Sequence, residues 1–437
     1  MYYWQLDTEA NNLINGRGRG VPDISAFDPS DIYAYYNATL PSYEPHAKVY
    51  GVPINGAVKP GLSASYDATG ANCENTLDLE MVGSTAPGAS IYNVYGPNAN
   101  LVCIDSAFAF ILNPNTTYKA LDNVSVITNS WDSTDNNNTP WYDYLQEAQT
   151  RGISVLASSG DSCDNTASPK YFGSTVYFPS TMAYDNFGVT AVGGDTLTLA
   201  SNLHILNETA WYETYSYTNG SPVGSTGGIS TLFKEPIWQL DTEANNSING
   251  QGRGVPDISA IANNTIVYIT IGGNPCVLIF EGTSVASPVE AGIIAEINAV
   301  LNHYNQSNLG YLNPLLYSLG NSQITTMKTT TYTGFIQTGK YNSTLPALPF
   351  YNVIYGHNHL YNAAYGYNLV TGWGSIDAYN MSLYVLNVNR SLSSVGLKGV
   401  ADNLHLSGLN VTSYFYNSTT GTYNIVNTAY NAANHQL

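Results

Sequence analysis

Charged side chains are scarce in this 437-residue chain. Asp, Glu, Lys and Arg together make up 10% of its residues, whereas a typical soluble protein has about 25%. Only 13 residues are Lys or Arg, and the formal net charge at pH 7 is −18. So few positive charges argue against nucleic acid and against an anionic membrane surface as partners. If every carboxyl group were protonated, only those 13 residues and 7 His would be charged. Repulsion between positive charges in acid would therefore be mild, so the composition suits an acidic medium.

The chain also lacks a signal peptide, a C-x-x-C pair and an apolar run of the ~18 residues that a membrane span needs. We therefore expect no membrane span in it, and the cysteine spacing argues against zinc. One or two disulfides are allowed, and their pairing stays open. About a dozen N-x-S/T sequons favour a secreted, glycosylated protein. A secreted protein without a leader is a processed or excised piece, and we expect this chain to be one. Nine of the sequons begin at Asn37, Asn115, Asn123, Asn207, Asn305, Asn342, Asn380, Asn410 and Asn417.

Apolar runs and helical patterns alternate through the middle of the chain. Residues 124–130 and 153–157 are apolar strand candidates, and residues 140–150 between them have a helical pattern. Alternation of this kind predicts an α/β fold with a mainly parallel sheet flanked by helices. Residues 266–280 have the pattern of a Val/Ile-rich hairpin, and after residue 392 alternating polar and aromatic residues indicate the start of a β-rich extension.

Residues 280–304, FEGTSVASPVEAGIIAEINAVLNHY, predict a buried central helix that begins at a small-residue turn. Apolar residues recur at spacings of three and four between Ala291 and Leu301, which gives one apolar stripe. Ser284 would lie at the positive end of the helix dipole, where a serine with a base beside it can act as a nucleophile. The alternative is a Ser/Thr N-cap, and the stretch alone does not decide between the two.

Two stretches of the chain are almost identical. Trp4–Ala26 reads WQLDTEANNLINGRGRGVPDISA, and Trp238–Ala260 reads WQLDTEANNSINGQGRGVPDISA. One segment cannot fill the same place in a domain twice, and a single recurrence does not make a solenoid. The second copy leads directly into the predicted central helix, so we assign it that place. We expect the first copy to be peripheral. The two copies differ at Leu13/Ser247 and Arg17/Gln251.

No histidine is placed to activate Ser284. Subtilisin-like peptidases have a G-T-S-x-A-S-P string like this one, with a histidine in an H-G-T-H setting as the base. None of the seven histidines here is followed by glycine. The histidine-based triad is therefore absent, and the base has to be sought among the carboxylates.

Glu74 and Asp78 are carboxylate candidates for this base. They are four residues apart in CENTLDLEMVGSTAPGA, so on a helix they share one face. Two carboxyl groups that share a proton beside a serine can deprotonate it, and they work best in acid. The alternative is a solvated helix face, which the surrounding Leu77, Leu79 and Met81 disfavour.

Asp161 is a third candidate carboxylate. It follows the strand candidate 153–157 in the string SSGDS, and ligands bind at the carboxyl ends of strands in open α/β sheets. If it faced Ser284 and carried a proton, it would donate a hydrogen bond to an oxyanion. The alternative is an Asx-turn.

Seven such motifs resemble the sedolisin (serine-carboxyl peptidase) family, in its order and at family-like spacing over roughly residues 28–385. They are E-x-x-x-D, the NSW turn, SSGDS, YFPST with VTAVGG, STGGIS, WQ with RGVPDISA, and EGTSVASP. The resemblance implies a subtilisin-like α/β domain with a seven-stranded, mainly parallel sheet. It also implies Ser284 as nucleophile, Glu74 as general base, Asp78 as its coupled residue and Asp161 as the oxyanion-hole acid.

The resemblance further implies a substrate cleft and a calcium site. Ser130 and Trp131 match cleft positions, as do Gly227 and Gly228 in the loop at residues 225–230. In the calcium loop, two expected aspartates are asparagines, which weakens a site for Ca²⁺, so calcium stays an open expectation. The candidate ligands are Asn352, Val353, Ala364, Gly366 and Asn368.

Two further departures from the family stand out. The chain between the first helix and E-x-x-x-D is too short for the family's glycine-rich strand, so a sheet strand is expected to be missing. The family's N-terminal prosegment is also absent, as expected of a mature or truncated chain. We divide the chain into a duplicated segment (residues 1–27), a sedolisin-like peptidase domain (28–392) and a β-rich extension (393–437).

The sequence thus predicts a secreted, monomeric endopeptidase that acts on polypeptides in an acidic environment. The alternative is a catalytically impaired or truncated surface protein on the same fold, motivated by the missing strand and the duplication. A pepsin-like aspartic protease is set aside because its two D-[ST]-G loops are lacking. Side-chain specificity and the choice between endopeptidase and tripeptidyl-peptidase stay open.

Overall fold

The computed structural model describes most of the chain. The described residues are 18–23, 26–61, 71–97, 101–164, 176–201, 205–214, 222–271, 273–329, 348–389, 410–417 and 422–429. Their helices are α2 (Pro29–Thr39), α3 (Ala71–Thr85), α4 (Leu101–Leu112), η2 (Thr116–Asn123), α5 (Thr139–Thr150), α6 (Ile237–Leu240), α7 (Asn245–Ile248), α8 (Thr283–His303), α9 (Asn313–Thr329) and α10 (Ala378–Asn389).

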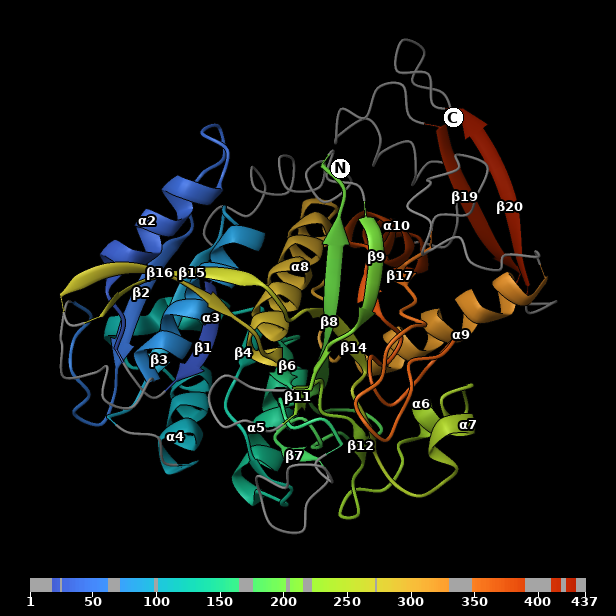
Figure 1. Ribbon diagram of the computed structural model, residues 1–437, viewed down its shortest axis with the longest axis horizontal. Helices are drawn as coiled ribbons and strands as arrows, with labels where there is room; N and C mark the ends of the chain where they lie inside the picture. Colours follow the sequence, from blue (N-terminus) through green and yellow to red (C-terminus); the bar gives the residue numbers. More distant parts are fainter. Residues whose placement is uncertain are drawn as a thin grey trace.

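An α/β sheet runs through the middle of the domain (Figure 1). Among the described residues it has eight strands, and all its pairings are parallel except that of β9 (Ile205–Ala210) with β8. Fold and sheet type thus confirm the predicted subtilisin-like architecture. The order of the parallel strands is β14 (Ile258–Ile261), β8 (Thr190–Leu199), β6 (Ser154–Ser158), β4 (Val126–Asn129), β1 (Gly18–Asp23), β3 (Ser90–Tyr95) and β2 (Lys48–Pro53).

Helices cover both faces of this sheet because its strands are apolar on both sides. Val126 and Leu156 belong to a core cluster with α8, whereas Ile127 and Val155 pack with α4 and α5 on the opposite face. Helix α3 packs against α8, and Gly292 of α8 makes the approach close, since a Cβ there would stand 2.5 Å from Thr85 of α3.

Helix α8 is the central buried helix that the sequence predicts. It is long and apolar enough to pass a test for a membrane span, but 89% of its apolar window is buried inside the fold. Among the described residues no other helix passes that test. Burial on this scale accounts for the apolar composition of α8 without a membrane.

The described strand of the first copy does not lie at the periphery. Its residues Gly18–Asp23 form β1, which lies between β3 and β4 and pairs with both in parallel. The expectation of a peripheral segment is therefore wrong for these six residues, and the sheet has a strand where one was expected to be missing. The physical reason is that β3 and β4 would each expose an unpaired edge inside the sheet without a strand between them.

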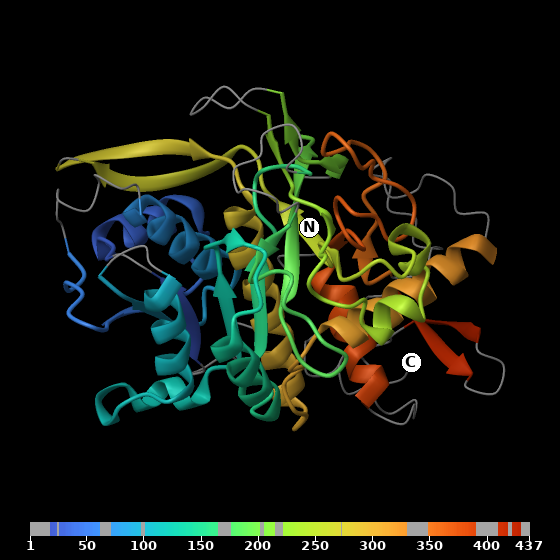
Figure 2. The same cartoon turned by 90° about the horizontal axis from the view of Figure 1, so that it is seen from below.

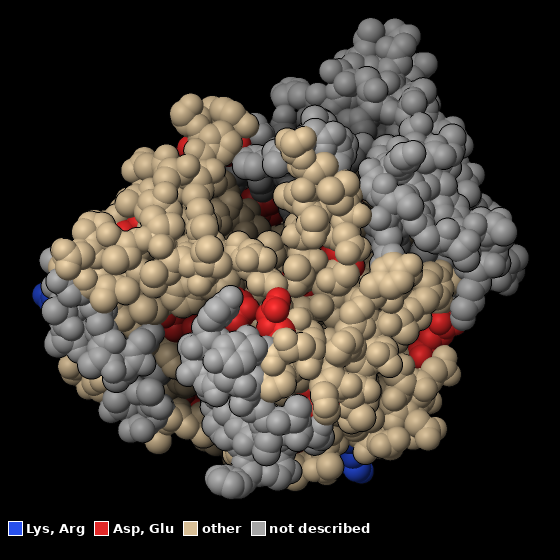
Figure 3. All heavy atoms as spheres, viewed as in Figure 1, with Lys and Arg blue, Asp and Glu red and all other residues tan. Residues whose placement is uncertain are grey.

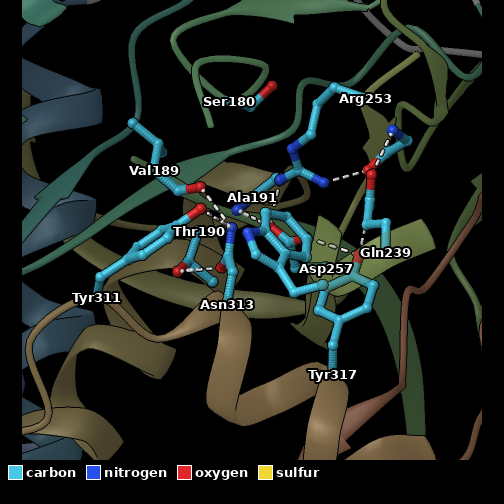
Figure 4. Close-up of polar contacts among 12 residues, drawn as sticks. Ser180, Val189, Thr190, Ala191, Gln239, Arg253, Asp257, Tyr311, Asn313 and Tyr317 are labelled. Carbon is cyan, nitrogen blue, oxygen red and sulfur yellow. Dashed lines mark hydrogen bonds and ion pairs between the residues drawn. The ribbon is translucent and has the colours of Figure 1, made fainter. Parts of the chain in front are cut away.

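The second copy makes a buried polar network (Figure 4). The fully buried Arg253 and Asp257 form a salt bridge. Asp257 also accepts hydrogen bonds from the Ala191 N–H (2.7 Å) and the Tyr317 hydroxyl (2.8 Å). The Gln239 side-chain amide donates to the Gly254 carbonyl and to the Tyr317 hydroxyl, both at 2.7 Å. These contacts fix the second copy to β8 and to α9.

Short two-stranded pairs lie around the sheet. The hairpin β15–β16 lies over α2 (Figure 2), where Asp31 of α2 accepts from the Thr270 N–H and hydroxyl at 2.7 Å each. The other pairs are β5 (Ser133–Thr134) with β7 (Tyr177–Phe178), β10 (Tyr212–Glu213) with β11 (Val223–Gly224), β12 (Gly228–Ile229) with β13 (Gly254–Val255), β15 (Thr265–Ile271) with β16 (Asn274–Phe280), β17 (Phe350–Tyr351) with β18 (Ser375–Ile376), and β19 (Asn410–Asn417) with β20 (Thr422–Ala429).

Candidate active site

Helix α3 carries both candidate carboxylates on its N-terminal half. Glu74 lies half-buried in the first turn, where the helix dipole favours a negative charge. Asp78, one turn later, is fully buried, and its Oδ1 accepts a hydrogen bond of 2.7 Å from the Ser130 hydroxyl. A buried carboxyl group with a fixed partner is not part of a solvated helix face, so that alternative is wrong for Asp78.

The candidate nucleophile Ser284 lies in the first turn of α8, partly exposed. The N-cap residue is Gly282, whose φ of 152° falls outside the region that side-chain-bearing residues prefer, and no side chain caps the helix. The N-cap alternative is therefore wrong for Ser284. The neighbouring Thr283 is fully buried and bonds to the loop after β6.

Strand β4 and the residues after it hold α3 and α8 together at this end. The Thr128 and Ser287 hydroxyls share a hydrogen bond of 2.8 Å, and two residues further along the chain Ser130 donates to Asp78. Ser284 precedes Ser287 by about one helical turn, and Glu74 precedes Asp78 by about one turn. The N-terminal parts of both helices are thereby fixed to one strand end.

Asp161 faces the start of α8 across the loop after β6. Its Oδ1 accepts from the Thr283 N–H (2.7 Å) and from the Thr283 hydroxyl (2.9 Å). The same hydroxyl accepts from the Gly160 N–H at 3.0 Å, and Gly160 has a φ of 104°. Thr283 is 122 residues away from Asp161 in the chain, so an Asx-turn does not account for these hydrogen bonds.

The predicted cleft loop lies against the Asp161 loop. The Thr226 N–H donates to the Gly160 carbonyl (2.9 Å), and the Thr226 hydroxyl accepts from the Ser162 N–H (2.8 Å). Gly227 is tightly packed, since a Cβ there would stand 1.8 Å from the Leu369 carbonyl oxygen. Gly228 follows as the first residue of β12. Only glycine fits at position 227.

Trp131 and Ser130 follow β4 at the same end of the sheet. The Trp131 ring is half-buried beside the core cluster of α4 and α5, and its carbonyl accepts a 2.6 Å bond from the Asn129 side chain. Ser130, predicted as a cleft residue, instead directs its hydroxyl to Asp78. Its side chain therefore belongs to the carboxylate arrangement.

The surroundings of this site are acidic. On the face drawn in Figure 3, carboxylate side chains gather around a central hollow, while the basic side chains drawn lie at its margin. Burial, with a further contribution from Glu213 and Asp161, raises the pKa of Glu281, which immediately precedes Gly282. Negative charges close to one another favour the protonated forms of the carboxyl groups involved.

The sequence-based reasoning missed the residues that connect these groups. Thr283 joins Ser284 to Asp161, Thr226 joins the cleft loop to the same place, and Thr128 joins β4 to α8. Thr283 stands inside the G-T-S string, which was interpreted only as a small-residue turn. The roles of Thr226 and Thr128 could not be predicted from local sequence patterns, because their hydrogen-bond partners are distant in the chain.

The predicted calcium ligands lie together in the loop after β17, but they bond to one another. The Asn352 side-chain NH₂ donates to the Gly366 carbonyl (3.0 Å), and the Gly366 N–H donates back to Asn352 Oδ1 (2.9 Å). The Asn368 NH₂ donates to the Ala364 carbonyl (3.3 Å). Val353 is buried beside them. Donor groups face the carbonyl oxygens that a cation needs, so these residues as arranged do not fit Ca²⁺. Among the described residues no group of three or more His, Cys, Asp or Glu is placed to hold a metal.

Comparisons with known proteins show which family this chain belongs to. The sequence pattern of the Subtilase family matches residues 64–336, more than half of the chain. Kumamolisin from Bacillus sp. (strain MN-32) is 29% identical over 377 residues, which cover 82% of this chain and 57% of kumamolisin. Tripeptidyl-peptidase sed4 of Aspergillus fumigatus is 33% identical over 234 residues, covering 49% of this chain and 34% of that protein. This chain therefore spans little more than half the length of the first of these relatives.

A solved structure has the same fold. Pseudomonas sedolisin, a serine-carboxyl proteinase complexed with two molecules of pseudo-iodotyrostatin, aligns with a TM-score of 0.64 and 24% sequence identity. The alignment covers 87% of this chain and 94% of that one.

Proposed function

Because this chain belongs to the subtilase family, in its sedolisin branch, we propose that it is a serine-carboxyl endopeptidase that hydrolyses polypeptides in acid. The observation that carries the proposal is the attachment of α3 and α8 to the end of β4. Asp78 and Ser287 are bonded to residues of the same strand end, in the helices that carry Glu74 and Ser284, and Asp161 is bonded to Thr283, the residue before the serine; this supports the proposal. We further propose a secreted, glycosylated monomer, in line with the sequons and the low charge.

In the proposed reaction the Ser284 hydroxyl oxygen attacks the scissile carbonyl carbon, and its proton passes to the Glu74 carboxylate. Asp78 hydrogen-bonds Glu74 and steadies the shared proton, while Ser130 holds Asp78. Protonated Asp161 donates a hydrogen bond to the oxyanion as it forms. The C–N bond then breaks, and Glu74 returns the proton to the leaving amine. Water, deprotonated by Glu74, attacks the acyl carbon. The ester bond then breaks, Glu74 returns the proton to the Ser284 oxygen, and the acid product leaves.

A carboxylate base gives this scheme a distinctive pH dependence. Glu74 must be ionised and Asp161 protonated, and both conditions hold together only at acidic pH. We expect hydrolysis of a denatured protein to peak at about pH 2–5. Glu74→Gln should lower kcat by roughly 100-fold or more, and Ser284→Ala should abolish covalent labelling by a peptide aldehyde. Full activity of Ser284→Ala would refute the serine mechanism.

The endopeptidase assignment is tested separately with an N-acetylated peptide. An endopeptidase cleaves it, whereas a tripeptidyl-peptidase, which releases residues from a free amino end, does not. The alternative of a catalytically impaired surface protein predicts neither hydrolysis nor labelling of Ser284 at any pH. A folded sample that shows neither would establish that alternative.

A further inference from the structure

The loop that follows β17 is cross-linked by asparagine side chains. Asn352, Asn358 and Asn368 are 1%, 0% and 3% exposed, so each amide must find its partners inside the protein. Asn352 donates to the Gly366 carbonyl (3.0 Å) and the Trp373 carbonyl (3.3 Å). Buried amides in such a network are expected to hold the loop in one conformation.

The orientation of both amides is dictated by backbone donors. The Gly366 N–H needs an acceptor and has Asn352 Oδ1 at 2.9 Å. Three donors bond to Asn368 Oδ1, namely the N–H groups of Val370 (3.1 Å) and Thr371 (2.9 Å) and the Thr371 hydroxyl (3.1 Å). Turning either amide over would place its NH₂ against these donors. The NH₂ groups are therefore fixed facing carbonyl oxygens.

Those carbonyl oxygens are the groups that a cation would otherwise neutralise. Asn352 covers the Gly366 oxygen, and Asn368 covers those of Ala364 (3.3 Å) and Gly372 (3.5 Å). A calcium ion requires six to eight oxygen ligands with their lone pairs directed inward. In this loop, two uncharged NH₂ groups, whose hydrogens are partly positive, contact the carbonyl oxygens that a calcium ion would bind.

The loop supports the cleft directly. The Asn358 NH₂ donates to the Ser225 carbonyl (3.1 Å), and the Ser225 hydroxyl donates to the Val370 carbonyl (2.7 Å). Gly227 has the Leu369 carbonyl against its Cα, with no room for a Cβ. A displacement of residues 368–370 would therefore displace the cleft loop beside Asp161.

We propose that Asn352 and Asn368 replace a bound cation in this chain, and that their amides position the cleft loop without metal. They are positioning residues, since they act through the loop and do not touch the reacting atoms. The proposal for the cleft rests on the proposed peptidase function, whereas the proposal for stability does not. The two parts are tested by different measurements.

The first experiment uses the unaltered chain. Its melting temperature is measured at pH 5 in EDTA and in millimolar CaCl₂. We expect the two values to agree within about 1 °C, because nothing that binds the folded state is added or removed. A rise of several degrees in CaCl₂ would overturn the proposal, whatever the activity.

Asparagine-to-aspartate variants then recreate the need for a cation. In Asn352→Asp/Asn368→Asp, carboxylate oxygens would face carbonyl oxygens. We expect a melting temperature in EDTA lower by roughly 5 °C or more, restored in part by CaCl₂. Asn136→Asp is the matched control, because Asn136 also donates its amide to a carbonyl, that of Thr134 (2.8 Å), but outside this loop. If that variant responds to calcium as the double variant does, the effect is not specific to the loop.

Should the double variant fail to fold, Asn352→Asp alone gives the same test. The kinetic experiment measures KM and kcat separately for the double variant in EDTA. We expect KM to rise several-fold with kcat less changed, since the cleft loop moves and the reacting groups do not. A fall in kcat as large as the rise in KM, with an unchanged melting temperature, would contradict the positioning role. Inactivity of the unaltered chain would refute the peptidase proposal but leave the calcium result standing.

Discussion

The two copies of the repeated sequence fold differently, although they differ at only two positions. In the first copy GRGVPD is one unbroken strand, β1, paired in parallel on both sides. In the second copy the same six residues, 252–257, are divided. Gly254–Val255 pairs antiparallel with β12, the Val255–Pro256 peptide bond is cis, and the chain then enters the sheet as β14. The neighbouring strands, and not the local sequence, decide which structure forms.

The interactions that hold each copy in place can also be compared. Main-chain pairing with β3 and β4 holds the first copy. The second copy is also paired through its main chain, with β12 and β8, and in addition the buried Arg253–Asp257 pair and its contacts with Ala191 and Tyr317 hold it. We infer that a change of side chain alone can destabilise the second copy.

Removing the first copy should have the largest effect. Deletion of residues 1–23 takes away β1 and leaves β3 and β4 without their shared partner, so we expect a loss of more than ~5 kcal/mol in unfolding free energy or no folding at all. Deletion of residues 1–16, which ends before β1, is the matched control and should be mild. Circular dichroism and urea unfolding measure both. Equal stability of the two truncated chains would show that β1 is dispensable.

Asp257→Asn against Asp23→Asn tests the side-chain half of the comparison. The change at 257 leaves the buried Arg253 charge without a counter-charge, for an expected loss of about 3–5 kcal/mol. The same change at 23 is the matched control, and we expect a smaller loss, because it leaves the main-chain pairing of β1 with β3 unchanged. Urea unfolding at pH 6 gives both values. If the two losses are alike, the copies are held in the same way and the distinction fails.

The second copy's side of the sheet contains buried carboxyl groups that should make its stability depend on pH. Asp195 pairs with Ile261 of β14, and the carboxyl groups of Glu208 and Glu290 interact with Asp195. Burial raises the pKa of all three, with the coupled Asp195 raised further by Glu208, and the pKa of Glu208 reaches about 7. Ser375 donates a 2.6 Å bond to Glu208.

The sign of the pH effect follows from these shifts. An unfolded Glu titrates near pH ~4.3, so the folded state binds the proton more tightly than the unfolded state. The stabilisation is complete below about pH 4 and is lost as the pH rises through 7, by ~3 kcal/mol for Glu208. Urea unfolding between pH 4 and 8 measures this slope. Glu208→Gln should reduce the slope and Asp23→Asn should not; an unchanged slope in Glu208→Gln would assign the pH dependence to the other buried carboxyl groups.

Making the copies identical should have the smallest effect. Ser247 and Gln251 are exposed. The Ser247 hydroxyl donates a hydrogen bond to the Tyr367 carbonyl (3.3 Å), and the backbone N–H groups of both residues donate to carbonyls nearby in the chain, which a change of side chain leaves in place. We expect Ser247→Leu/Gln251→Arg to change the unfolding free energy by no more than ~0.5 kcal/mol. A large loss in a thermal melt would mean that these two residues, and not the neighbouring strands, assign each copy to its place.

Much of the fold and of the candidate site followed from local patterns. The strand–helix–strand alternation predicted the parallel sheet, and the apolar stripe of residues 291–301 predicted α8 as the buried helix. The spacing of Glu74 and Asp78 placed them on one helix, and Asp161 was expected at a strand end, where it lies. Each of these depends on residues close together in the sequence.

The remainder depended on partners far apart in the chain. The place of β1 is set by main-chain hydrogen bonds, which any residue except proline can donate and which therefore leave little trace in side-chain chemistry. The orientation of the Asn352 and Asn368 amides could not be predicted, because it is set by Gly366 and Thr371. The bond from Ser130 to Asp78 could not be predicted either, because it spans 52 residues.

The position of β1 also bears on how the chain folds while it is being synthesised. The copies start 234 residues apart, at Trp4 and Trp238, so at about 5–20 residues per second the second follows the first by roughly 10–50 s. During that interval β3 and β4 emerge, and only the first copy exists to fill the gap between them. A chain diluted out of denaturant has both copies at once, and they compete for the same gap. We therefore expect synthesis from the N-terminus to assign the first copy to the gap between β3 and β4, whereas refolding from denaturant leaves both copies able to enter it.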